Sequence, residues 1–178
     1  MNHPEAWFPD LESAQLADVE VMDRLEQEAF NTPWSRELLR GAILNPDYTV
    51  RVTRLPTQEV LGFYIAHPDQ ERFNLDNLVV APEHRNQGLG TALIQDWAEQ
   101  GLDRGLSRLT LQVNTDNVAA QRLYKRLGFA SARLLVSYYP NGDDAYYMIR
   151  PTQLGDDGLR ARRHLQAWVE RAQDKSRR

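Results

Sequence analysis

Hydrophobic positions recur with two different periods along the chain, and the change of period predicts the order of its elements. From Leu16 to Phe30 apolar residues recur every three or four positions, which predicts an amphipathic helix. Asn31-Thr32-Pro33 breaks this pattern, and Ser35 is a good N-cap for a second, shorter helix over residues 36–44. Residues 1–15 are mixed and predict a strand or an arm.

Beyond residue 47 the period becomes two, as in strands with one buried face. The predicted strands cover residues 48–54, 60–66, 75–80, 106–113, 129–136 and 145–149. Two further helices lie between them, one from the glycine-bearing stretch 85–90 to about Arg104 and one over 117–127, which ends at Gly128. Early strands joined by turns and later strands joined by helices predict an α/β (α+β) domain with a mixed sheet.

Residues 151–178 differ in character from the domain over 1–150. Pro151 and the Gly155-Asp156-Asp157-Gly158 stretch predict a linker, and a C-terminal amphipathic helix rich in arginine follows, with its apolar stripe at Ala161, Leu165, Trp168 and Ala172. Three interpretations of this helix stay open: it packs on its own domain, it contacts a partner or a second copy, or it frays as a tail.

Composition narrows the classes of function. Of the 178 residues, 42% are hydrophobic and 26% are charged, as expected for one globular domain with an appendage. The absence of cysteine excludes disulfides, a thiolate nucleophile and cysteine-ligated metals, and four scattered histidines predict no metal site. A formal net charge of −4 argues against a general nucleic-acid binder.

No apolar run approaches the ~20 residues of a membrane span, and the start of the sequence lacks the basic and apolar blocks of a signal peptide. The expected compartment is the cytoplasm, and monomer and homodimer both stay open.

A glycine-bearing loop between a strand and a helix carries the clearest chemical signal. Gly88 and Gly90 open the helix, where absent side chains let backbone N–H groups and the helix dipole face an anion. A Walker loop needs Gly-Lys-Ser/Thr, which the chain lacks. A Rossmann loop needs a third glycine where Leu93 stands and tolerates no seven-residue gap after Val80. The remaining cradle is the Arg/Gln-x-x-Gly-x-Gly/Ala loop that binds acetyl-CoA.

Several motifs, in order, resemble those of the GCN5-related N-acetyltransferase (GNAT) superfamily: Arg85-Asn86-Gln87-Gly88-Leu89-Gly90, Asn117-Val118-Ala119-Ala120, Leu123-Tyr124 and Leu127-Gly128-Phe129. Within it, the chain is most similar to the RimI-type ribosomal-protein alanine N-acetyltransferases, through Pro33-Trp34-Ser35, the strand end from Asn77 to Pro82, and Tyr138-Tyr139-Pro140. The resemblance spans about Val19 to Ile149. It implies the GNAT fold, a mixed and mostly antiparallel central sheet with helices on both faces, here with an extra C-terminal helix.

The resemblance also implies how acetyl-CoA is held as cosubstrate. The pantetheine arm would pair like an added strand with the backbone of Leu78, Val79 and Val80. Amides of the loop would surround the pyrophosphate; these belong to Asn86, Gln87, Gly88, Leu89, Gly90 and Thr91, with Arg85 in the same motif. Asn117 matches a position that hydrogen-bonds the cofactor, and it also suits a helix N-cap.

Acetyl transfer needs a neutral amine and a stabilised departing thiolate. Tyr124 matches the family's general acid, and an unperturbed pKa of about 10 keeps a phenol protonated at pH 7. Where the family's strand carries a glutamate as base, this chain has Gln112, which accepts no proton usefully. Asp76 is the candidate substitute, expected by alternation to share a face with Asn74, Leu78 and Val80.

The missing base bears on the acceptor. At pH 7.5 a lysine ammonium costs about 4 kcal/mol to deprotonate and an α-amino group well below ~1 kcal/mol. We therefore expect a protein or peptide N-terminus as acceptor, which for RimI-type enzymes is the alanine of ribosomal protein S18. Trp34, Tyr138 and Tyr139 are the candidate residues lining the acceptor site. A small-molecule amine, a lysine side chain, and a non-catalytic acyl-CoA-binding module remain as alternatives.

Overall fold

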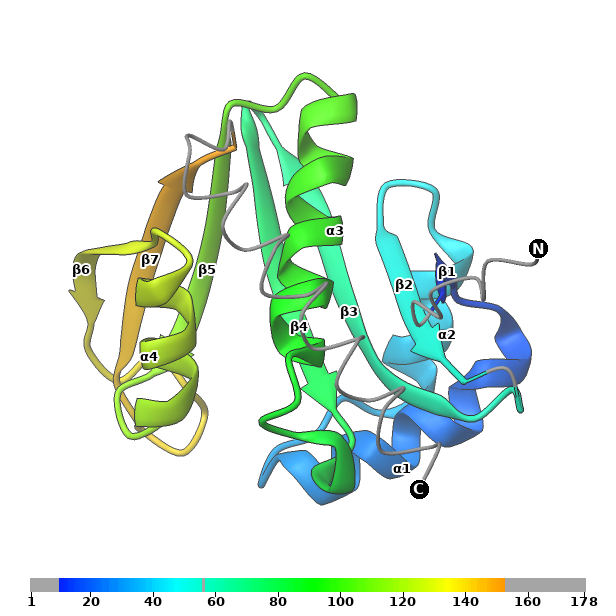
Figure 1. Cartoon of the computed structure of the whole chain (residues 1–178). Coiled ribbons are helices and arrows are strands. Elements are labelled where there is room, and N and C mark those ends of the chain that lie inside the picture. The colour runs from blue at the N-terminus through cyan, green and yellow to red at the C-terminus, as the bar shows by residue number, and fades with distance from the viewer. Residues whose placement is uncertain (1–9, 56, 153–178) are drawn as a thin grey trace, which may run out of the picture.

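A seven-stranded open sheet forms the centre of the computed structural model, which describes residues 10–55 and 57–152 (Figure 1). The strand order is β1-β2-β3-β4-β5-β7-β6. The strands are β1 (Asp10–Ser13), β2 (Thr49–Arg54), β3 (Val60–Asp69), β4 (Arg72–Val80), β5 (Arg108–Asn114), β6 (Ala130–Leu135) and β7 (Ala145–Pro151). Among these described strands β4 and β5 are the only parallel neighbours, which confirms a mixed, mostly antiparallel sheet.

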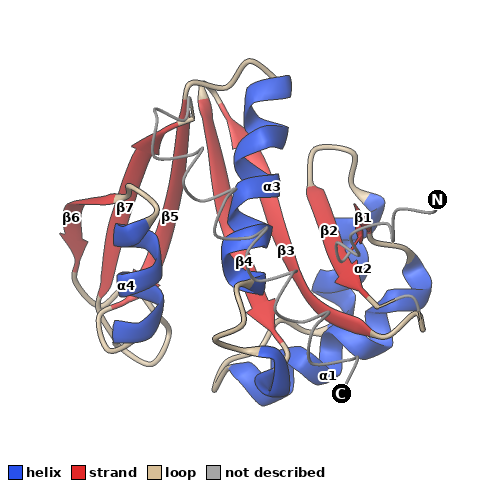
Figure 2. Cartoon of the chain, viewed as in Figure 1, coloured by secondary structure: helices blue, strands red, loops and turns tan. Residues whose placement is uncertain are grey.

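Helices cover both faces of the sheet, as the resemblance implied (Figure 2). One face carries α1 (Val19–Ala29) and α2 (Arg36–Leu44), and the other carries α3 (Leu89–Asp103) and α4 (Val118–Arg126). Two short 3-10 helices, Leu16–Asp18 and Pro82–His84, precede α1 and the glycine loop. The Ser35 hydroxyl accepts from the Leu38 amide at 3.3 Å, so α2 begins at the predicted cap.

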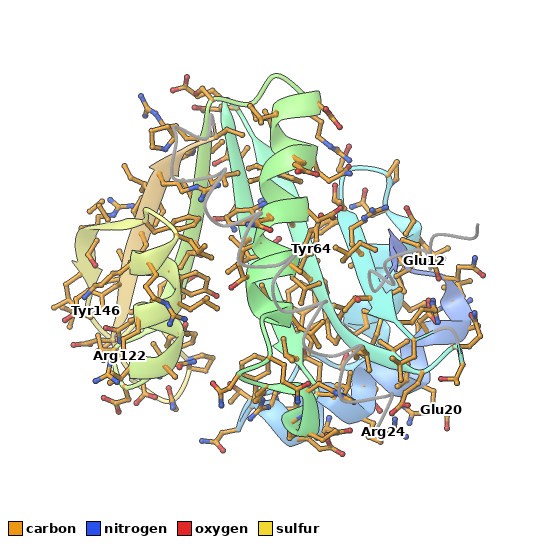
Figure 3. All side chains as sticks on the ribbon, viewed as in Figure 1. Glu12, Glu20, Arg24, Tyr64, Arg122 and Tyr146 are labelled. Atoms are coloured by element: carbon orange, nitrogen blue, oxygen red, sulfur yellow. The ribbon has the colours of Figure 1, made fainter. Side chains whose placement is uncertain are left out.

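Each face has its own core. On the α3 face Trp97 packs between Phe73 and Phe129, with ring centroids 6.2 and 5.8 Å apart. Tyr64 points from β3 toward α3 (Figure 3), and its hydroxyl donates to Asp96 at 2.7 Å. On the other face the fully buried side chains are Met22, Leu39, Val52, Phe63 and Ile65. Burial of each such side chain contributes about 1.5–3 kcal/mol, so both helix layers are held firmly to the sheet.

β4 and β5 separate after a short stretch of pairing. Their parallel pairing runs from Arg72↔Arg108 to Leu75↔Leu111, and beyond that point the strands diverge toward the lower edge of Figure 1. β4 continues to Val80, paired with β3 along its other edge. Within the described residues, the edge of β4 from 76 to 80 that faces β5 therefore has no strand partner, and α3 begins shortly beyond it.

A β-bulge reverses the alternation of β4. Ile65 pairs with Asn77 and Ala66 pairs with Leu75, so Asp76 is the extra residue. Leu75 consequently faces the α3 core, Val79 faces the α1/α2 core, and Leu78 and Val80 pack on the α3 side. The prediction that Asp76 shares a face with Leu78 and Val80 is wrong, because unbroken alternation does not cross a bulge. Its common face with Asn74 is confirmed by a hydrogen bond between the two side chains.

The predicted C-terminal helix and all of its linker after residue 152 lie outside the described residues. Among the helices that the structure describes, none is both long enough and apolar enough to cross a membrane.

Candidate active site

The glycine loop presents a row of unused backbone donors. Gly88 is the N-cap of α3 with φ 93°, and Asn86 has φ 58°, so the chain turns through the left-handed region twice before the helix. Within the described part of the chain, the backbone N–H groups of residues 86–91 donate to no protein acceptor. Six consecutive free N–H groups at the positive end of a helix form a cradle for an anion.

Side chains of the same loop brace it. Arg85 Nε donates to the carbonyl of Val80 at 3.0 Å, and Gln87 Nε2 donates to the carbonyl of Glu83 at 2.9 Å. A Cβ atom at Gly90 would lie 3.2 Å from Leu123 Cδ2 in α4. The second glycine therefore also makes room for α4, which brings Tyr124 toward the separating strands.

Tyr124 lies in the core of the α3 face with its side chain almost fully buried. Its ring stands edge-on to Phe129, with centroids 5.8 Å apart. Burial, with a smaller contribution from Tyr139, raises the pKa of the Tyr124 phenol above its usual range. The hydroxyl therefore keeps its proton, and it has no hydrogen-bond partner among the described residues. At the start of the same helix Asn117 Oδ1 accepts from the Ala120 amide at 3.0 Å, so Asn117 is the N-cap.

A row of polar side chains crosses β3, β4 and β5 on the α1/α2 face. Asp76 Oδ2 lies 2.5 Å from His67 Nδ1, and Asp76 Oδ1 accepts from Asn74 Nδ2 at 2.7 Å. Asn74 Oδ1 in turn accepts from Thr110 Oγ1 at 3.1 Å. Burial raises the pKa of Asp76, and the hydrogen bond from His67 opposes this shift. Gln112, two residues after Thr110 in β5, faces the same side, and its amide has no partner in the described ranges.

The connection between β6 and β7 links this row to Tyr124. Tyr138 and Tyr139 stand edge to face, with centroids 5.1 Å apart. Burial and the nearby charge of Asp76 raise the pKa of Tyr138, whose side chain is half exposed. Tyr139 lies near enough to Tyr124 to affect its pKa. One loop thus carries two tyrosines, of which Tyr138 interacts electrostatically with Asp76 and Tyr139 with Tyr124.

The Trp34 backbone is hydrogen-bonded to the carboxylate of Glu26, a residue that the sequence analysis did not select as a candidate. The Trp34 amide donates to Glu26 Oε2 at 2.9 Å, and Asn77 Nδ2 donates to Glu26 Oε1 at 2.5 Å. Glu26 is fully buried, and burial raises the pKa of its carboxyl against the lowering effect of the two hydrogen bonds. Glu26 therefore ties the α1–α2 connection to β4 next to Asp76.

His67 is the second functional candidate that sequence reasoning missed. It lies just beyond the predicted end of the strand over 60–66, so its direction could not be assigned. For Glu26 a signal existed, since this carboxylate falls on the apolar stripe of the predicted helix. One cluster among the described residues, Glu59, Glu83 and His84, brings ligand atoms within 4.8 Å of one another, but it is a surface group of a common kind and indicates no metal.

Comparisons with known proteins agree with this geometry. The model of the acetyltransferase (GNAT) family matches residues 16–129. An uncharacterized N-acetyltransferase of Methanocaldococcus jannaschii is 30% identical over 134 residues, which are 75% of this chain and 85% of that protein. The [ribosomal protein bS18]-alanine N-acetyltransferase of Escherichia coli is 29% identical over 147 residues, which are 81% of this chain and 98% of that enzyme. A crystal structure of the Escherichia coli ribosomal-protein-S18-alanine N-acetyltransferase has a TM-score of 0.74 at 29% identity, covering 82% of this chain and 95% of that one.

Proposed function

Because the chain belongs to the acetyltransferase (GNAT) family, we propose that it transfers the acetyl group of acetyl-CoA to the N-terminal α-amine of a protein. The class of enzyme, an N-acetyltransferase, and the use of acetyl-CoA follow from the family. The observation that carries the proposal is the joint placement of an anion cradle and a buried phenol at the separating strands β4 and β5. The acceptor and the residue roles are our inferences.

The loop and β4 together suit coenzyme A. Its pyrophosphate would lie against the free N–H groups of residues 86–91. Its pantetheine arm carries amides, and it would add to the unpaired edge of β4 at Leu78, Val79 and Val80 as a further strand does. Arg85 braces the loop through the Val80 carbonyl, and Asn117 keeps its side-chain N–H group for the cofactor.

The chemistry would be direct attack in a ternary complex. The neutral amine attacks the thioester carbon, the C–S bond breaks, and the sulfur leaves with the electron pair. Tyr124, kept protonated by burial, would donate its hydroxyl to that sulfur. Because the phenol is a weaker acid than a thiol, its hydrogen bond to the thiolate matters as much as full proton transfer. Gln112 faces the acceptor side and would orient the amine or a water.

An N-terminal α-amine is the acceptor that these features favour. The relative in Escherichia coli acts on alanine of ribosomal protein bS18, as its name states, and it matches most of this chain. Trp34 on one side and Tyr138 and Tyr139 on the other would flank an extended peptide. The absence of the family's glutamate at Gln112 is tolerated best by an amine of low pKa. A ribosomal-protein acceptor would place the reaction in the predicted compartment, the cytoplasm.

Two measurements test the proposal. Acetyl-CoA at about 100 times its Kd should stabilise the protein by about 2.7 kcal/mol and raise its Tm. Intact mass should then show one acetyl group on peptides with a free N-terminus and no lysine, and none on N-terminally blocked peptides that contain lysine. Acetylation of lysine or of small amines alone would overturn the proposed acceptor. Binding without turnover on any amine would show a non-catalytic acyl-CoA-binding module.

A further inference from the structure

We propose that His67, oriented by Asp76, is the base that takes the proton from the acceptor ammonium. This inference rests on the proposed function and concerns the step for which the family's glutamate is missing at Gln112. Sequence reasoning offered only Asp76 for this role. The structure adds the imidazole that makes the pair chemically suited to it.

The pair lies where an acceptor amine would approach. Asp76 is the first residue of β4 beyond the last β4–β5 pair, and Gln112 is the corresponding first residue of β5. Tyr138 of the β6–β7 connection lies close enough to feel the Asp76 charge. The side chain of His67 is 32% exposed, and Nε2 has no hydrogen-bond partner among the described residues. A reacting amine, directly or through one water, can therefore reach this nitrogen.

The hydrogen bonds assign the roles within the pair. An ionised carboxylate only accepts, so Nδ1 carries the ring proton and Nε2 holds the lone pair. Asn74 occupies the other oxygen of Asp76 and is itself held by Thr110. Asp76 is thus fixed as a positioning residue, as the aspartate is in a Ser-His-Asp triad.

Basicity also favours the imidazole over the carboxylate. A base works best when its pKa lies near the operating pH, and reference values are about 6.5 for histidine and about 3.9 for aspartate. The groups in contact with His67 are Asp76 from β4 and the Tyr48 ring, whose centroid lies 5.4 Å from that of His67. Tyr138 is the titratable group whose pKa burial and the Asp76 charge raise. Asp76 is the one carboxylate in contact with the ring in the described residues.

The acceptor ammonium gives one proton to His67 Nε2, and the freed lone pair on nitrogen attacks the thioester carbon. The C–S bond then breaks with its electrons on sulfur. The sulfur takes a proton from the Tyr124 hydroxyl, and the second proton lost from the acceptor nitrogen restores that hydroxyl. His67 releases its proton to solvent, so one acetyl group moves and one proton is set free.

Two single variants and two double variants test the pair. His67→Gln keeps a donor for Asp76 but removes the base, and we expect kcat/KM for an N-terminal peptide to fall by about 10²-fold at pH 7, with the Kd for acetyl-CoA within about twofold of wild type. Asp76→Asn should cost a similar factor, because its amide donates to Nδ1 and moves the ring proton to Nε2. The double variant His67→Gln/Asp76→Asn should be no slower than His67→Gln alone. His67→Gln/Gln112→Glu, which restores the family's glutamate, should regain most of the loss.

The readouts separate a base from a structural residue. Wild-type kcat/KM should depend on one more ionisation between pH 5 and 8 than that of His67→Gln. Wild-type rates in His67→Gln across this range would overturn the proposal. If Asp76→Asn lost activity while His67→Gln kept it, Asp76 itself would be the base. If neither variant folds, the pH dependence of wild-type kcat/KM still tests the proposal. A profile that shows no ionisation besides that of the acceptor amine would overturn it. Failure of the proposed function is a different result, since the wild-type protein itself would then acetylate no N-terminus.

Discussion

Removal of the Glu26 carboxylate tests whether its hydrogen bonds to the Trp34 backbone and the Asn77 side chain stabilise the region that we propose binds the acceptor. In Glu26→Ala the Trp34 amide and the Asn77 side-chain amide both lose the acceptor that the fully buried Glu26 side chain provides. Each unsatisfied buried donor costs about 1–3 kcal/mol. The variant no longer buries a carboxylate, which offsets part of this cost. We therefore expect the free energy of unfolding to fall by about 2–4 kcal/mol, a large share of the ~5–15 kcal/mol that is typical of proteins.

Glu26→Gln is the matched control, because it keeps the shape and the acceptor for the Trp34 amide. Rotation of the Asn77 amide would let its oxygen accept from the new side chain, so we expect a loss below about 1 kcal/mol. The pH dependence of the free energy of unfolding also distinguishes wild-type Glu26 from the Glu26→Gln variant. Burial raises the pKa of Glu26 in the folded state, so the folded protein binds more protons than the unfolded one above the ordinary value of 4.5. Stability contributed by Glu26 is therefore present below that value and is lost as the pH rises through the raised pKa. Glu26→Gln should lack this decline.

Urea unfolding at a series of pH values between 4 and 8 provides the measurement, with acceptor KM and acetyl-CoA Kd determined alongside. The alanine variant should raise the acceptor KM more than the acetyl-CoA Kd, because Glu26 lies on the face opposite to α3. An alanine variant within about 1 kcal/mol of wild type, or a glutamine variant with the wild-type pH slope, would refute the reasoning.

Three further substitutions probe the cofactor side. Tyr124→Phe should slow turnover by about 10- to 1,000-fold with stability within about 0.5 kcal/mol of wild type, since its hydroxyl has no partner in the described residues, and unchanged turnover would remove Tyr124 from the mechanism. Gly88→Val places a branched side chain at φ 93° in the cradle, and calorimetry should show acetyl-CoA binding abolished; intact affinity would mean the cradle is wrongly assigned. Gly62→Ala puts a Cβ atom 2.6 Å from the Val79 carbonyl, so β3 and β4 must shift, at about 1–3 kcal/mol and with weaker acetyl-CoA binding. Gly41→Ala, with no atom within 4 Å of the new methyl group, is the control and should stabilise α2 by about 0.5–1 kcal/mol; equal effects in urea unfolding would contradict the packing argument.

Local signals explain what could be predicted from the sequence. The two ends of α2 depend on residues that are neighbours in the chain. Ser35 precedes the helix and Asn45-Pro46 follows it, and the helix begins and ends where these residues predict. The left-handed turn at Gly88 is likewise a property of one residue, and the free amides of residues 86–91 follow from the helix start behind it. Motif order then predicts the fold, because each motif marks the join between one element and the next.

The acceptor side could not be predicted in the same way, because its geometry depends on how β3 pairs with β4. The bulge at Asp76 is a matter of register between two strands, and no residue near it marks it in the sequence. Its effect is to turn Asp76 toward His67, while Leu78 and Val80 return to the α3 side. In a regular strand without the bulge, Asp76, Leu78 and Val80 would lie on the same face. With the bulge, one part of β4 serves the edge that we propose for the pantetheine arm, and the preceding part presents a carboxylate to the acceptor. The contact of Asp76 with His67 therefore follows from the bulge, and a variant that removed the bulge by deleting Asp76 should lose acceptor turnover while Ile65 still pairs with Asn77 and Ala66 with Leu75.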